Sequence, residues 1–325
     1  MSFLIIISVF VVSCIVIYFA GEWVVDGVMS VAKYLGWKEF VLSFLVMAFF
    51  GSLPNLFVGI TSAFQGIPEL SLGDIISGNI IDLTLVLALP ILLTGRAILT
   101  ESRTINMTLF FTMGAITLPL ILSLDGLLSR VDGIILIFFY FTYIFWLFAK
   151  KERFIKIYDN DCEPKKDLGK AFLAFIQNIF KTLAGIVLIL IASQGIVWAA
   201  QGVAEGLAMP VILVGIFIVS FGNAVPELYF TLKCSQKQNC YMLLGNIMGC
   251  VIIPATLILG IVTLINPITI NNLDNLAVAR AFLFIACLFF FIFGLSGKKV
   301  SVKEAWVLVG VYVAFIVSEI VISLN

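Results

Sequence analysis

The sequence predicts an all-α, polytopic membrane protein with ten transmembrane helices, arranged as two inverted five-helix repeats. Its 325 residues are 62% hydrophobic and only 12% charged, which is about half the charge of an average soluble domain. Long apolar runs alternate with short polar stretches, and roughly 20 apolar residues are needed to cross a bilayer core. The second half of the chain also repeats the first. These observations leave no room for a separate soluble domain.

The apolar runs form ten spans around one polar segment. The first run starts at Phe3 without a basic stretch before it or an obvious cleavage site after it, so we expect a membrane helix rather than a signal peptide. The polar segment 151–170 separates a first half, residues 1–150, from a second half, residues 171–325. The predicted spans lie near residues 3–31, 38–64, 70–93, 105–123, 131–149, 172–201, 209–232, 241–263, 277–295 and 303–322.

Lysine and arginine positions predict the orientation. When the loops are numbered alternately, sixteen of the 19 basic residues fall on one side, and only Arg130 and Arg280 fall on the other. Seven of the sixteen lie between Lys150 and Lys170. Because cytoplasmic loops carry the excess of basic residues, we expect a multi-pass protein of the plasma membrane. Both termini would be extracytoplasmic and the central loop, 151–170, cytoplasmic.

The two halves align without a gap over about 45 positions when the sequence is shifted by 172 residues. Five helices per half is an odd number, so the second copy must enter the membrane from the opposite face. Inverted repeats of this kind are typical of secondary transporters, whose substrate site lies near the middle of the bilayer. Matching positions include Phe49 and Phe221, Pro54 and Pro226, Leu56 and Leu228, Gly73 and Gly245, and Thr84 and Thr256.

Each repeat contains a polar segment that is interrupted by proline. The first, Ala48–Asn55, ends in an amide, and the second, Ser220–Glu227, ends in a carboxylate. Proline removes a backbone hydrogen bond inside a helix and frees carbonyl groups, which membrane proteins tolerate only within protein or beside a water-filled cavity. Carbonyl, hydroxyl and carboxylate oxygens are the ligands that hard cations prefer. The two breaks therefore predict a cation site.

A second pair of polar segments, Gly73–Asp82 and Gly245–Pro254, follows in the next helix of each half. Their small residues allow close helix packing, and packing is the role that we expect of the glycines. Asn79 and Asp82 lie three residues apart, on one helical face. Ionisable groups in a membrane are costly and usually face a pathway or a partner, so Asp82 is a candidate ligand, with the holding of neighbouring hydroxyls as the alternative. For Asp74 we expect an interaction with the helix dipole.

These four segments resemble the alpha-repeats of the sodium/calcium exchanger family, part of the wider cation/Ca²⁺ exchanger group. Residues 222–227 and 245–249 are similar to its Gly-Thr-Ser-x-Pro-Glu-type and Gly-Asn-x-x-Gly-Ser-Asn-type motifs, and residues 51–54 and 73–82 match more loosely. The repeats would cover about 40–93 and 210–263.

In that family, two glutamates and the Asn or Asp of the second motif surround the ions. By position, the resemblance places the four ion-binding positions at Asn55, Asn79, Glu227 and Val251, and supporting positions at Gly51, Ser52, Ser77, Asn223, Ala224 and Gly249. We expect the ion-binding residues to be Glu227, Asn55, Asn79, Asp82, Ser52, Ser77 and Asn223. Of these, Glu227, Asn55 and Asn79 would contact the metal ion.

The chain departs from the family pattern at the site itself. Asn55 stands where the family has a glutamate, Val251 cannot coordinate an ion, and Pro254 stands at the position that repeats Asp82. With one carboxylate fewer, a divalent ion would keep a net charge, and one charge at about 4 Å is worth roughly 4 kcal/mol at an effective dielectric constant near 20. We expect weakened Ca²⁺ affinity, unless Asp82 or Asp74 takes the place of the lost carboxylate.

The resemblance predicts a secondary-active cation antiporter that works by alternating access, is not an enzyme and needs no cofactor. Its partners would be inorganic cations and the lipid bilayer, not nucleic acid. Transported ions would include Na⁺, with Ca²⁺, K⁺ and H⁺ as candidates. The alternative is a transport-inactive homologue with a structural or regulatory role in the membrane. An intramembrane aspartyl protease would leave the inverted repeat unexplained, and the sequence contains no P-loop for ATP-driven pumping.

Overall fold

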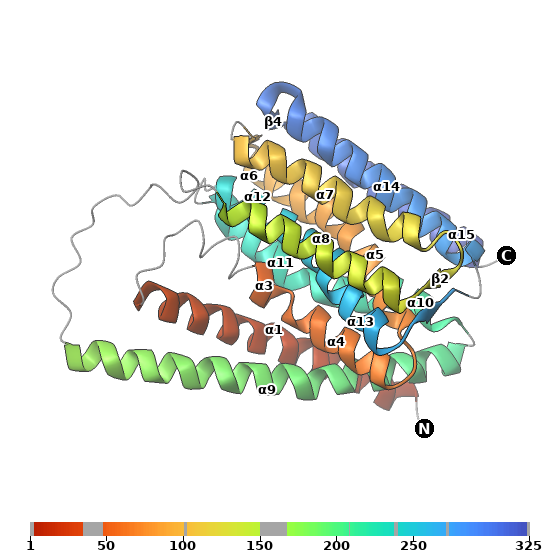
Figure 1. Ribbon diagram of the computed structural model, residues 1–325, viewed down its shortest axis with the longest axis horizontal. Helices are drawn as coiled ribbons and strands as arrows, with labels where there is room; N and C mark the ends of the chain where they lie inside the picture. The colour runs from red at the N-terminus through yellow and green to blue at the C-terminus, as the bar shows by residue number, and fades with distance from the viewer. Residues whose placement is uncertain are drawn as a thin grey trace.

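The structure, a computed structural model, describes residues 3–34, 48–100, 103–149, 168–207, 209–236, 240–270 and 273–323. Almost all of this is helical (Figure 1), which confirms the predicted fold class. Within the described residues, eight helices are long and apolar enough to cross a membrane, and a bent pair, Val211–Val225 with Glu227–Gln236, makes a ninth. The predicted second span is described only from residue 48, so ten spans agree with the structure without being counted in it.

The first half contains a long first helix, a broken second one and three further spans. In chain order its elements are α1 (Phe3–Tyr34), α3 (Ala48–Gly51), α4 (Leu53–Phe64), α5 (Glu69–Ile81), the π-helix η2 (Asp82–Val86), α6 (Leu87–Thr94), β1 (Ile98–Leu99), α7 (Arg103–Leu122), β2 (Leu127–Leu128) and α8 (Arg130–Phe148).

The second half follows the same order. Its elements are α9 (Leu168–Leu207), α10 (Val211–Val214), the π-helix η4 (Gly215–Val219), α11 (Ser220–Gln236), α12 (Cys240–Ile252), the π-helix η5 (Ile253–Ile258), α13 (Leu259–Ile265), β3 (Ile268–Thr269), α14 (Leu273–Leu295), the short 3₁₀ turn η6 (Ser296–Lys298), β4 (Lys299–Val300) and α15 (Val302–Ser323). The shift of 172 residues places the start of α8 on the start of α15, and η2 on η5.

Two short antiparallel strand pairs join the halves. In one, β1 pairs with β4, with Ile98 opposite Val300; in the other, β2 pairs with β3, with Leu128 opposite Ile268. Each pair takes one strand from each half and connects two loops that the charge pattern assigns to the same side of the membrane. This exchange is what two antiparallel copies of one unit produce. Which side is cytoplasmic stays a prediction, as do the boundaries of the two halves.

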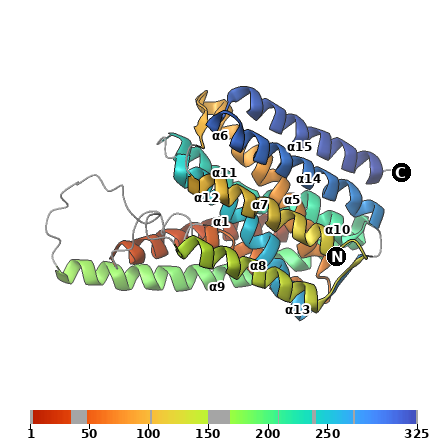
Figure 2. The ribbon, with the colours of Figure 1, turned by 45° about the horizontal axis from the view of Figure 1, so that its top comes forward.

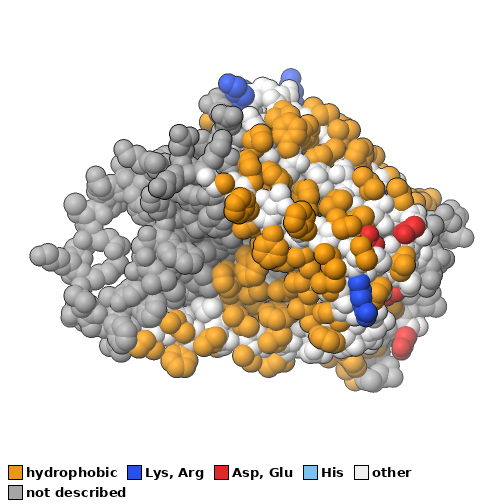
Figure 3. Space-filling model, in the orientation of Figure 1, with side chains coloured by type: hydrophobic (Ala, Val, Ile, Leu, Met, Phe, Trp, Pro, Cys, Tyr) orange, Lys and Arg blue, Asp and Glu red, His pale blue; other side chains and the backbone are white. Residues whose placement is uncertain are grey.

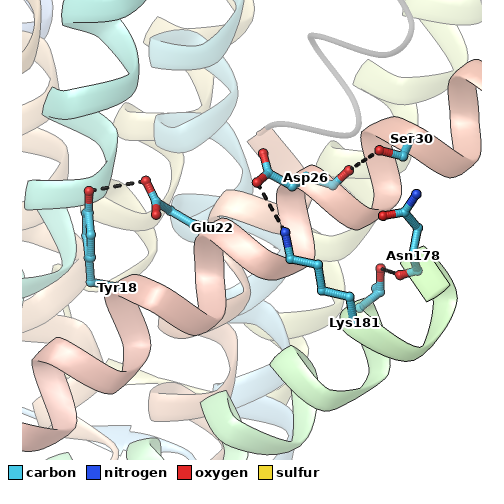
Figure 4. Close-up of polar contacts among 7 residues, drawn as sticks. Tyr18, Glu22, Asp26, Ser30, Asn178 and Lys181 are labelled. Carbon is cyan, nitrogen blue, oxygen red and sulfur yellow. Dashed lines mark hydrogen bonds and ion pairs between the residues drawn. The ribbon is translucent and has the colours of Figure 1, made fainter. Parts of the chain in front are cut away.

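Helices α1 and α9 lie side by side along one edge of the molecule (Figures 1 and 2). Glycines bring them close: a Cβ atom on Gly185 would lie 2.9 Å from the backbone oxygen of Ala20. Near the C-terminal end of α1, the Lys181 ammonium lies 3.4 Å from the Asp26 carboxylate, while Tyr18 donates a hydrogen bond of 3.2 Å to Glu22 (Figure 4). The two equivalent helices of the repeat thus form one pair.

The surface of the described helices is mainly apolar, and the few charged side chains on the face in Figure 3 lie toward its ends. Large side chains such as Phe138 and Phe145 are 73% and 78% exposed. An exposed apolar surface of this extent fits contact with lipid. The polar side chains are instead buried between α4, α5 and α11, where the two broken helices meet.

Candidate functional site

The two helix breaks differ in form. In the first half, the chain is interrupted at Ser52, and Pro54 lies in the first turn of α4, a position where its missing N–H has no helical partner to lose. In the second half, the helix continues through Pro226 but bends there by 41°. The prediction of a break near each proline is confirmed, although the first break comes two residues before Pro54.

A small cavity lies between these breaks, bounded by α4, α5, η2, α11 and η5. Its volume is about 10 Å³, the space that one water-sized sphere needs. Both halves contribute to its walls. The lining residues are Asn55, Asp74, Ile75, Gly78, Asn79, Asp82, Ser220, Asn223, Ala224, Glu227 and Pro254.

Three buried acids line the cavity: Asp74, Asp82 and Glu227, which are 2%, 3% and 8% exposed. The carboxyl groups of Asp82 and Glu227 are hydrogen-bonding neighbours. Two carboxyl groups in contact repel each other unless a proton or a cation lies between them. No lysine or arginine lines the cavity to supply that charge, so this pair is a place where a cation would be bound.

Two polar atoms at the cavity have no protein partner: Asp82 Oδ1 and Asn79 Nδ2. Both residues are almost fully buried. A buried polar atom without a hydrogen bond is costly. The structure therefore leaves Asp82 able to accept a further contact from an ion or a water molecule.

Asp74 is held by the opposite half. The side-chain amide of Asn223 on α11 donates to both carboxylate oxygens, Oδ1 at 3.2 Å and Oδ2 at 3.0 Å. One turn further along α5, the hydroxyls of Ser77 and Ser220 lie 3.2 Å apart. These contacts fix α5 of the first half against α11 of the second at the level of the cavity.

Another side of Glu227 is covered by Cys250, whose buried thiol is its hydrogen-bonding neighbour. The Ser52 side chain contacts the same thiol and donates to the Ala48 carbonyl at 2.7 Å. Within the described residues, no three Cys, Asp or Glu side chains are arranged to hold a metal ion by themselves. An ion here would need amide, hydroxyl, backbone or water oxygens as well.

The structure brings five of the seven predicted ion-binding residues to the cavity wall: Asn55, Asn79, Asp82, Asn223 and Glu227. Ser52 and Ser77 lie behind the wall, in the contacts just described. Val251 is fully buried in the apolar core. The roles of these residues as ligands stay predictions.

Sequence reasoning missed Ser220 and Pro254 as lining residues and Cys250 as a neighbour of Glu227, and it expected Asp74 to interact with a helix dipole rather than to line the cavity. Ser220 carried a signal, because it opens the polar segment that ends at Glu227.

The π-helices were also not predicted. Asp82 is the first residue of η2, and Pro254 is the second residue of η5. A π-turn adds a residue to the helical repeat and turns the side chains that follow, and such turns are frequent at functional sites. No residue type signals them reliably. Here they occur at repeat-related positions, directly beside the cavity.

An inverted repeat, two broken helices and buried acids at their junction define a polytopic membrane transporter. Comparison with known proteins agrees. The sequence pattern of the family described as "Sodium/calcium exchanger protein" matches residues 5–149 and 178–321. The chain belongs to the sodium/calcium exchanger family, whose members are transporters of cations and not enzymes.

Individual relatives share less than a quarter of their residues with the chain. It is 24% identical to a putative antiporter, CaxA, of Alkalimonas amylolytica, with 79% of each chain covered. It is 23% identical to the sodium/calcium exchanger MaX1 of Methanosarcina acetivorans, covering 91% of this chain and 93% of that protein. An uncharacterised membrane protein of Methanocaldococcus jannaschii is 23% identical, with 75% and 76% covered.

The fold matches solved structures. The structure of the sodium-calcium exchanger NCX_Mj soaked with 10 mM Na⁺ and zero Ca²⁺ superposes with a TM-score of 0.67 at 22% identity, covering 97% of this chain and 99% of that one. The same exchanger with zero Na⁺ and Ca²⁺ gives 0.65 at 21% identity. At this identity, the likeness is one of fold.

Proposed function

We propose that the protein is a secondary-active cation antiporter, which binds its ions in the cavity between the two repeats and opens that cavity to either side of the membrane in turn. The contact between the carboxyl groups of Asp82 and Glu227 carries the proposal. Two acids from different halves meet inside a membrane protein, without a basic residue in the cavity wall. A transported cation would balance their charge.

The surroundings of this pair supply further oxygen ligands. Asn55, Asn79 and Asn223 have amide oxygens in or beside the cavity, and Ser220 has a hydroxyl. A cavity for one water-sized sphere requires the ion to lose most of its hydration shell, and oxygen ligands replace that shell for Na⁺ and Ca²⁺ alike. Because α4 and α11 are broken at this level, backbone carbonyls beside the breaks add to the ligand set.

The family transports Na⁺ and Ca²⁺, and we propose Na⁺ as one transported ion, with Ca²⁺, K⁺ or H⁺ as the other. The weakened Ca²⁺ affinity expected from Asn55 and Val251 stays a prediction. It assumes that no other acid replaces the lost glutamate, whereas Asp74 and Asp82 both line the cavity. The plasma-membrane location and the orientation with a cytoplasmic central loop also belong to this proposal.

Cation flux in proteoliposomes tests the proposal, with Na⁺, K⁺, H⁺ and Ca²⁺ gradients applied in turn. Glu227→Gln keeps the size of the side chain and removes its charge, and we expect it to abolish coupled exchange. Glu205→Gln is a matched control, because Glu205 is exposed on α9 and does not line the cavity. Equal flux through the wild type and Glu227→Gln would refute the proposal.

The alternative, a transport-inactive homologue, is favoured by the replaced positions Asn55, Val251 and Pro254. It predicts that the wild type exchanges none of the four cations, in either direction, although it is folded. The same flux assay therefore separates the two functions.

A further inference from the structure

Four repeat-related positions line the cavity as two pairs. Asn55 of the first half corresponds to Glu227 of the second, and Asp82 of the first half corresponds to Pro254 of the second; all four are in the cavity wall. Each pair has one acid and one residue that cannot ionise. The four positions together therefore hold two carboxylates, the number that two glutamates at 55 and 227 would supply.

The geometry distinguishes which acid stands in for the missing one. Asp82 contacts the Glu227 carboxyl group and has an oxygen, Oδ1, without a protein partner. Asp74 also lines the cavity, but both of its oxygens accept hydrogen bonds from the Asn223 amide. Asp82 is thus the acid beside Glu227 with capacity left for an ion, whereas Asp74 is engaged with its partner.

The position of Asp82 in its helix fits this role. It is the residue at which α5 gives way to the π-helix η2. It is 3% exposed and lies in a wall formed with Asn55 of α4 and Glu227 of α11. An unpaired buried carboxylate is strongly destabilising, so a second acid next to Glu227 needs a compensating charge. A divalent cation balances two carboxylates, whereas a monovalent one balances one.

We infer that Asp82 supplies the negative charge that position 55 lacks, so that the site keeps two carboxylates and binds a divalent cation of the Ca²⁺ type. This inference rests on the proposed function, because it concerns the same cavity. It reverses the expected weakening of Ca²⁺ binding. Asp82 is then a residue that determines ion selectivity: without it the site suits monovalent cations.

Ca²⁺ binding to the purified full-length protein tests the inference. We expect Asp82→Asn to lower the Ca²⁺ affinity by about a thousandfold, the effect of one charge at close range. The double variant Asn55→Glu/Asp82→Asn moves the carboxylate back to α4, and we expect it to recover affinity to within about tenfold of the wild type, since it restores the charge with altered geometry. Asp26→Asn, at an exposed acid outside the cavity, is the matched control and should bind as the wild type does.

Three results would overturn the inference: wild-type affinity in Asp82→Asn, no recovery in a folded double variant, or a wild type that exchanges monovalent cations without binding Ca²⁺. If the double variant does not fold, as judged by size exclusion and thermal unfolding, Asp82→Asn decides alone. Failure of the proposed function looks different, because Glu227→Gln would then leave the flux of every cation unchanged, whatever Asp82→Asn does to Ca²⁺ affinity.

Discussion

Gly73 is the residue where the close packing of the two repeats is most exposed to a single change. It lies on α5, next to Asp74, and faces the backbone of α10. A Cβ atom built on Gly73 would lie 2.2 Å from the backbone oxygen of Ile212. Gly215 has the converse contact, with its Cβ position 2.4 Å from the backbone oxygen of Leu70. Backbone atoms cannot rotate away, so Gly73→Ala must push the two helices apart.

The size of this shift follows from the contact distances. Carbon and oxygen atoms in contact lie at about 3.3 Å, so α5 and α10 must separate by about 1 Å. Overpacking of a tight interface usually costs about 1–3 kcal/mol. The shift is also large beside the tolerance of ion coordination, about 0.2 Å. We therefore expect lower stability together with a loss of cation flux, since Asp74 moves away from Asn223.

The assay combines thermal unfolding in detergent with cation flux in proteoliposomes. Gly310→Ala is the control, because nothing lies within 4 Å of a Cβ atom at Gly310 in α15. Alanine is the better helix former by up to about 1 kcal/mol, so this variant should be as stable as the wild type or more so. If Gly73→Ala unfolds at the same temperature and transports at the same rate as the wild type, the packing argument is wrong.

Three further predictions concern the contacts described above. Asn223→Ala leaves the buried Asp74 carboxylate without its two amide hydrogen bonds, and we expect a loss of about 1–3 kcal/mol in stability, measured by thermal unfolding; an unchanged unfolding temperature would contradict this. Lys181→Ala removes the exposed ion pair with Asp26, where the two side chains are 37% and 70% exposed, and should change stability by less than about 1 kcal/mol; a larger loss would mean that the pair is shielded from solvent. A transported cation at a hundred times its Kd should stabilise the wild type by about 2.7 kcal/mol and leave Glu227→Gln unaffected, and equal stabilisation of both would place the ion elsewhere.

The fold could be predicted from the sequence because a bilayer imposes simple rules. Apolar runs of fixed length and alternating basic loops gave the spans, and the shift of 172 residues gave the inverted repeat, which the exchanged strand pairs then showed in space. The first helix break could be placed only approximately. Pro54 permits a helix to start as well as to end, and the chain breaks at Ser52.

The candidate site was harder to predict, because its residues come together through packing between the halves. Motif position indicated Asn55, Asn79 and Glu227, and all three line the cavity. It could not indicate that Asp82 contacts Glu227, since that depends on how η2 packs against α11. Nor could it separate Ser220, which lines the cavity, from Ser77, which lies behind it within hydrogen-bonding distance.

The exchanged strands bear on how such a chain is made. Leu127 pairs with Thr269, and Ile98 with Val300, so neither connection can form until the ribosome has passed well beyond the central loop. Until then, the newly inserted first half holds Asp74 and Asp82 in the membrane without their counterparts from α11. The two halves must therefore mature together. A gene cut within the central loop would give a working protein only if both fragments reached the same membrane.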